Sequence, residues 1–349
     1  MTKLRKKTEL IREFIIESIE NNQKELISNV AKKFNITRQA VHRHIKQLTE
    51  QKVLIHTEHG QYELCPQEEW SETFSIHNNS AEDVVWREII APRIGKLPDN
   101  AFGIWYYGFT EMFNNVIDHS ESSDVLIKIK KTAYTTQMDI ADNGVGIFNK
   151  IKNAMNLIDE RHAVLELTKG KLTTDPKSHS GEGIFFTSRM FDTFYILSGD
   201  VFLSHRYGED EDWILQNSAN QNGTWVSMKL KNNTARTKKE IYDKFSDDDY
   251  GFTKTVVPVR LAQYGNEKLI SRSQAKRLLE RVDRFKTVLF DFAEVETIGQ
   301  AFADEVFRVF VNEHPHIKIL PINANDDVKQ MIKRVTSDSS PEQGQLFST

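Results

Sequence analysis

The sequence predicts a multidomain α+β protein, and three observations support this prediction. The 349 residues exceed the usual size of one domain. The spacing of apolar residues is helical near the N-terminus, mixed in the middle, and alternates between strands and helices towards the C-terminus. A hydrophobic fraction of 39% and a charged fraction of 28% are typical of a soluble globular chain.

Polar stretches between the periodic segments mark the expected domain boundaries. We expect folded domains at residues 1–65, 81–232 and 250–338, a linker at 66–80 and a disordered tail at 339–349. No apolar run approaches the roughly eighteen residues that cross a bilayer, and no secretory segment follows the first residues. The lone cysteine fits a reducing compartment. We therefore expect a cytoplasmic protein without a membrane partner.

The net charge of −4 is distributed unevenly along the chain. Residues 1–52 hold twelve Lys and Arg against six Asp and Glu, whereas the remaining residues hold 34 against 44. An anionic partner is therefore expected to dock at the N-terminal end.

Residues 8–64 have the pattern of three helices followed by a hairpin. The third helix begins after a good N-cap, Thr37, and the connector that precedes it is short, as in a helix-turn-helix. With the hairpin, this is the order of a winged helix-turn-helix. Five side chains share the outward face of the third helix: Arg38, Gln39, His42, Arg43 and Lys46.

Those five side chains allow two interpretations, a solvated helix surface or a DNA-binding face. The region resembles bacterial winged-helix regulators, and this resemblance implies that the third helix enters the major groove of DNA. Because one such module has a small footprint on DNA, we expect a homodimer.

The stretch GFTEMFNNVIDHS, residues 108–120, has an apolar face typical of a core helix. A second face holds Glu111, Asn115 and His119 at intervals of four. Three further motifs follow in order: DNGVG at 142–146, GEG at 181–183 and GT at 223–224. Each motif alone is weak, since glycine-containing turns are common.

Together the four motifs resemble the ATP-binding domain of the GHKL superfamily, which includes histidine kinases, a gyrase subunit, MutL proteins and heat-shock chaperones. The resemblance spans residues 100–230 and implies a Bergerat α/β sandwich that binds ATP and Mg²⁺. It implies that Asn115 is a metal ligand and that Glu111 orients or deprotonates the attacking water. Asp142 and Thr224 would bind adenine. The glycines would let the backbone approach the nucleotide: Gly144, Gly146, Gly181 and Gly183.

The same resemblance makes residues 147–180 a lid. Among its residues are His162, Lys169, Lys171, Lys177 and His179, and we expect one of these three lysines to reach the γ-phosphate, with the choice among them open. Asp118 stands where kinases of the superfamily often have Lys or Arg, which favours hydrolysis over phosphotransfer.

Residues 250–338 resemble a STAS-like domain, the fold of anti-sigma factor antagonists. Gly299, Gln300, Ala301 and Phe302 stand where antagonists have a phosphorylated serine turn, so this region is expected to dock a protein partner. The leading hypothesis is a DNA-binding regulator controlled by Mg-ATP. A protein kinase acting on a partner, and a conformational ATPase of a nucleic-acid-binding defence or remodelling assembly, are the alternatives.

Overall fold

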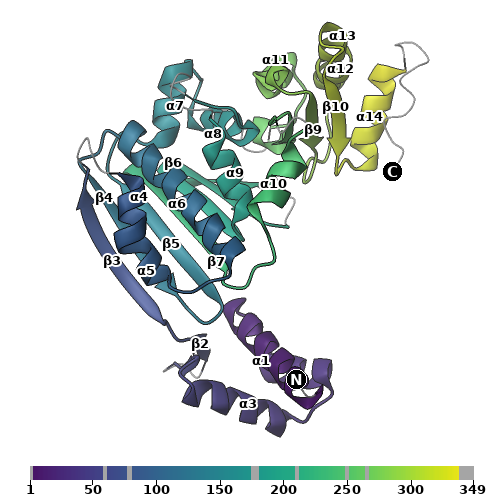
Figure 1. Cartoon of the computed structure of the whole chain (residues 1–349). Coiled ribbons are helices and arrows are strands. Elements are labelled where there is room, and N and C mark those ends of the chain that lie inside the picture. Colours follow the sequence, from purple (N-terminus) through teal and green to yellow (C-terminus); the bar gives the residue numbers. More distant parts are fainter. Residues whose placement is uncertain are drawn as a thin grey trace.

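The computed structural model describes residues 3–57, 61–76, 81–173, 181–208, 212–247, 251–263 and 267–337. The tail predicted to be disordered, 339–349, lies outside these ranges. Three units follow one another along the chain, and Figure 1 shows the central unit between the N-terminal and C-terminal units. No helix in the described ranges combines the length and the apolar character that a membrane crossing requires.

The N-terminal unit consists of three helices and a two-stranded antiparallel hairpin. Its elements are α1 (Lys3–Glu20), α2 (Leu26–Phe34), α3 (Arg38–Glu50), β1 (Leu54–His56) and β2 (Tyr62–Leu64). The predicted N-cap is confirmed, because the Thr37 hydroxyl accepts the Ala40 N–H at 3.2 Å. Val41, Ile45 and Leu48 face the core of this unit, also as predicted.

The central unit is a five-stranded sheet whose helices cover one face (Figure 1). Its strands are β3 (Glu68–Ser75), β4 (Asp124–Lys131), β5 (Thr135–Asp142), β6 (Thr193–Arg206) and β7 (Asp212–Lys231). The order is β3-β4-β5-β7-β6 and all neighbours are antiparallel. The helices are α4 (Glu82–Val85), the π-helical η1 (Trp86–Ile90), α5 (Ala91–Ile94), α6 (Asp99–His119), α7 (Ile147–Met155), α8 (Glu160–Lys169), α9 (Gly183–Met190) and α10 (Lys238–Phe245).

The segment predicted as a linker, 66–80, contains an edge strand. All eight residues of β3 pair with β4, and Trp70 and Phe74 turn inward against the central core. The Arg93 guanidinium stacks on the Trp70 ring at 4.1 Å. Only residues 65–67 separate β2 from β3, and backbone hydrogen bonds hold Cys65 to Val53 and Gln67 to Lys131. The N-terminal unit is therefore joined to the sheet by a short, hydrogen-bonded connection.

The C-terminal unit has a three-stranded parallel sheet in the order β10-β9-β8, in agreement with the strands and helices expected to alternate there. Its strands are β8 (Lys254–Pro258), β9 (Thr287–Asp291) and β10 (Lys318–Ile322). Between the strands come η2 (Val259–Ala262), α11 (Arg272–Leu279), η3 (Val282–Arg284), α12 (Gln300–Asp304), η4 (Glu305–Val309) and α13 (Phe310–Glu313), and α14 (Asp326–Thr336) follows β10.

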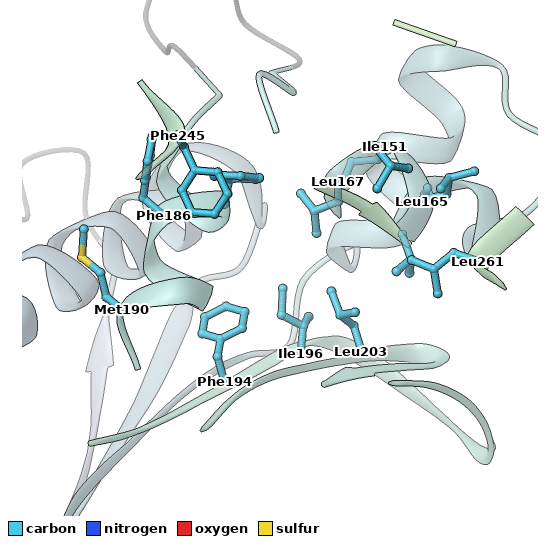
Figure 2. Packing of buried hydrophobic residues seen from close by; sticks show 14 of the residues in the cluster. Ile151, Leu165, Leu167, Phe186, Met190, Phe194, Ile196, Leu203, Phe245 and Leu261 are labelled. Carbon is cyan, nitrogen blue, oxygen red and sulfur yellow. The ribbon is translucent and has the colours of Figure 1, made fainter. Parts of the chain in front are cut away.

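One apolar core runs from the central unit into the C-terminal unit. Phe185 of α9 packs on Phe245 of α10 and on Phe252 before β8, with ring centroids 5.0 and 4.5 Å apart. Leu261 of η2 belongs to the same core as Leu165 of α8 (Figure 2). The polar boundary predicted at 231–250 therefore includes a helix, α10, that closes this joint core.

Candidate functional site

A cavity of about 310 Å³ lies between α6, β5, β7, α7 and the start of α9. Its wall includes six of the residues predicted for nucleotide binding: Glu111, Asn115, Asp142, Gly181, Gly183 and Thr224. Apolar side chains, including Met112, Ile140 and Val226, form the rest of the wall beside them. Motifs more than one hundred residues apart in the sequence thus meet at one cavity. Its volume is typical of sites that bind small ligands.

Asp142, at the end of β5, is held by the backbone around it. Its Oδ1 accepts the Gly144 N–H at 2.9 Å and the Thr224 N–H at 3.3 Å. The Thr224 hydroxyl oxygen accepts the Ile147 N–H at 3.0 Å, which leaves its own proton for another acceptor. Burial raises the pKa of Asp142, and the two backbone donors oppose that shift. This network presents an acceptor and a hydroxyl to the cavity.

Two glycines allow this close packing. A Cβ at Gly144 would lie 1.9 Å from the Ser120 carbonyl oxygen, and one at Gly223 would lie 2.1 Å from the Asp142 carbonyl oxygen. Gly223 also has a φ of +80°, which L side chains rarely adopt. Gly144 and Gly146, also predicted to bind nucleotide, are not among the residues that line the cavity.

Glu111 and Asn115 lie one turn apart on α6 and both face the cavity. A Cβ at Gly183 would lie 2.0 Å from Glu111 Oε2, so the carboxylate lies against the first residue of α9. The N-cap residue of α9, Glu182, does not cap the helix with its side chain. The N–H groups of the first turn of a helix favour negative charge. The amide oxygen of Asn115 is a ligand type that Mg²⁺ accepts.

Lys150 and His119 also line the cavity, and the sequence analysis assigned neither to nucleotide binding. The Lys150 ammonium donates to the His119 carbonyl at 2.7 Å and forms an ion pair with Glu121 at 3.3 Å. Lys150 lies in the first turns of α7, directly after the DNGVG motif, and that position was the signal available in the sequence.

The predicted lid is mostly helical where it is described. Residues 147–155 form α7, residues 160–169 form α8, and the side chains from His162 to Lys169 are buried. Lys169 and Lys171 point to the C-terminal unit, where they donate to the Glu280 and Arg284 carbonyls at 2.7 and 2.9 Å. Neither lysine lines the cavity, and Lys177 and His179 lie outside the described residues. The expectation of a lid lysine at the γ-phosphate is therefore wrong for Lys169 and Lys171.

The side chains predicted to meet DNA are all exposed on α3: Arg38, Gln39, His42, Arg43 and Lys46. They lie opposite the buried face of α3, at the end of the molecule away from the C-terminal unit (Figure 1). Lys46 forms an exposed ion pair with Glu50 at 3.8 Å, a type of pair that contributes little to stability.

The last turn of α1 docks on one end of the central sheet. The Tyr134 hydroxyl donates to Glu17 at 2.8 Å, and the Thr135 hydroxyl donates to Glu20 at 3.1 Å. Lys229 and Lys231 of β7 form ion pairs with the same two carboxylates. The Tyr134 hydroxyl lowers the pKa of Glu17, and the Lys231 ammonium adds to that shift.

Comparison with known families identifies one part of the chain. Residues 274–329 match the family described as a STAS-like domain of unknown function (DUF4325). These residues run from α11 into α14, so the C-terminal unit contains a STAS-like domain, as predicted. A search of curated proteins gave no match.

Proposed function

We propose that the protein is a DNA-binding regulator in which Mg-ATP, bound by a GHKL-type central unit, controls an N-terminal winged helix. One observation carries this proposal: Glu111, Asn115, Asp142, the GEG glycines and Thr224 meet at one cavity. This is the arrangement that the resemblance to the GHKL superfamily implies. Adenine lies at Asp142, and the phosphates lie at the N-terminus of α9.

The chemistry of the wall fits this placement of the nucleotide. The second oxygen of Asp142 accepts the adenine amino group, whereas guanine presents a carbonyl there and leaves the carboxylate unpaired. The N–H groups of the first turn of α9 and the Lys150 ammonium favour phosphate. Asn115 would hold Mg²⁺ through its amide oxygen, and the ion would neutralise charge on the phosphates.

The DNA-binding part of the proposal rests on α3. Its exposed face carries Arg38, Arg43 and Lys46 beside two polar side chains, and the short hairpin β1-β2 lies next to it in the chain. Arginine is suited to paired contacts with guanine, and lysine to phosphate. A regulator of this kind binds DNA as a dimer, because one module has a small footprint.

Strands β5 and β7 offer a route between the two sites. Thr135, at the docking site of α1, and Asp142, at the cavity, are the first and last residues of β5. The seven steps between them span roughly 23 Å at the rise of an extended strand. β7 pairs with β5 and ends at Lys231, and its Thr224 directly precedes Trp225, which pairs with Ala141 near the end of β5. A nucleotide that shifts these strand ends also shifts the surface on which α1 lies.

Calorimetry with Mg-ATP tests the nucleotide site. We expect Asn115→Ala and Asp142→Asn each to weaken binding by about 1–3 kcal/mol, because each removes a charge-assisted contact. Asn114→Ala is the matched control, since Asn114 neighbours Asn115 on α6 but is not part of the cavity wall. The wild type should prefer ATP to GTP, and Asp142→Asn should reduce that preference. Unchanged ATP affinity in both variants contradicts the site.

A further inference from the structure

The C-terminal end of α8 is capped by side chains from the C-terminal unit. Arg281 Nη1 donates to the Glu166 carbonyl at 3.4 Å, and Nη2 donates to the Gly170 and Lys171 carbonyls at 3.4 and 2.5 Å. The Thr255 hydroxyl donates to the Lys169 carbonyl at 2.7 Å. The last carbonyls of a helix lack partners within the helix, and here another domain supplies them.

A buried cluster of charges holds the same contact together. The Glu166 side chain is fully buried; its Oε1 lies 2.5 Å from Lys169 Nζ and its Oε2 lies 2.9 Å from Arg281 Nη1. The Lys169 ammonium completes its bonding with the Arg277 and Glu280 carbonyls, at 3.2 and 2.7 Å. We call Glu166, Lys169 and Arg281 the α8 clasp.

His162 and Glu280 lie at the edge of the clasp. An imidazole close to two carboxylates is a combination that can bind a metal ion. One ligand atom from each of His162, Glu166 and Glu280 fits within 4.8 Å. Both oxygens of Glu166 are already bound by cationic groups, however. The carboxylate is thus compensated by the clasp itself, and the geometry favours a contact between domains over a metal site.

The clasp lies beside the cavity wall. Leu167 of α8 lines the cavity, and so do Leu172 and Thr173, which directly follow the residues held by Arg281. Leu172 also donates its N–H to the Gly181 carbonyl at 3.1 Å. Lys171 and Arg281 both have left-handed backbones, with φ of 51° and 60°. Such conformations persist in residues other than glycine where the surroundings hold them.

We propose that Arg281 of the STAS-like domain is a positioning residue for the nucleotide cavity. It fixes the end of α8 and residues 170–171, and thereby the wall formed by Leu172 and Thr173. The STAS-like domain is then a part of the nucleotide site, and a partner that displaces Arg281 weakens nucleotide binding. This inference rests on the proposed function of the cavity.

The test uses two measurements on the full chain. Amide hydrogen exchange is followed in the absence of nucleotide, and calorimetry measures the affinity for Mg-ATP. Arg281→Met removes the guanidinium and keeps much of the apolar stem. We expect exchange at residues 167–173 to accelerate by at least about tenfold. We expect Mg-ATP affinity to fall about 5- to 150-fold, the usual range of coupling between sites. Arg281→Lys restores the charge opposite Glu166 without the guanidinium fork that reaches three carbonyls, so it should recover part of the affinity.

Two controls separate positioning from general stability. Arg334→Met changes an exposed arginine of α14 and should leave exchange and affinity unchanged. Ile332→Ala opens a buried position of α14 and should lower the unfolding temperature, with affinity kept where the variant remains folded. Wild-type exchange and affinity in Arg281→Met would overturn the inference, as would an equal loss of affinity in Ile332→Ala. If the wild type binds no Mg-ATP, the proposed function fails, and exchange still decides whether Arg281 holds residues 170–173.

Discussion

Replacing Glu111 by Ala is expected to slow ATP hydrolysis by about 10²- to 10⁴-fold, the contribution of a positioned general base. Glu111 lies one turn before Asn115 on α6, against Gly183 at the start of α9, where the phosphates are placed. Because the proposed role of Glu111 is to act on the attacking water and not to hold the nucleotide, Mg-ATP affinity should change little. Release of labelled γ-phosphate measures the rate, and calorimetry measures the affinity.

Asp99→Ala is a suitable control for this prediction. It removes an exposed carboxylate from the other end of the same helix and should hydrolyse ATP as the wild type does. Normal turnover in Glu111→Ala shows that Glu111 is structural. Label recovered on protein, in place of free phosphate, shows a kinase. A chain that produces neither is a binding switch.

The second large effect is expected at the DNA-binding face of α3. Arg38→Ala and Arg43→Ala should each weaken specific DNA binding by about 1–3 kcal/mol, because each removes a contact to a base edge. The two losses should add to roughly 2–6 kcal/mol in the double variant, provided that the side chains act independently. Fluorescence anisotropy with a labelled duplex, at several salt concentrations, measures these losses.

Lys46→Ala should behave differently from the arginine variants. A lysine that meets phosphate contributes equally to all sequences, so its loss should lower affinity uniformly and reduce the salt slope by about one. Lys96→Ala, which changes an exposed lysine of the central unit, should bind DNA as the wild type does. Undiminished DNA binding in the double arginine variant places the DNA site elsewhere.

The parts of the fold with one buried face were predictable from periodicity. α3 shows Val41, Ile45 and Leu48 at helical spacing behind a Thr37 cap, and the structure has both features. The C-terminal unit alternates short apolar strands with capped helices, and its parallel order followed from that alternation. The four motifs around Glu111, Asp142, Gly181 and Thr224 were found in the sequence, and the structure brings them to one cavity.

Elements buried on more than one side were not predictable in the same way. α8 contacts both the central and the C-terminal unit, and its Glu166 and Lys169 look like surface charges until Arg281, more than one hundred residues later, completes the clasp. β3 is an edge strand in which only alternate side chains are partly buried, so its pattern resembled that of a linker. Edge strands commonly carry such polar patterns.

The helix around Pro92 shows a third limit. The structure continues through η1, where the Ala91 N–H bonds to the Trp86 carbonyl, five residues back, and Pro92 enters α5 near its start. A wider turn ahead of proline leaves the helix axis unbroken, because the proline lies where an N–H is not required. Local propensity alone does not reveal such a turn.

The central claim, that ATP controls DNA binding, is tested most directly by the DNA affinity of the wild type in three states: without nucleotide, with ADP, and with a non-hydrolysable ATP analogue and Mg²⁺. The account predicts a change of about 5- to 150-fold between the nucleotide-free and ATP-like states, equivalent to 1–3 kcal/mol of coupling, and an equal change in nucleotide affinity when DNA is added. Equal DNA affinity in all three states contradicts it, because the N-terminal and central units then act independently.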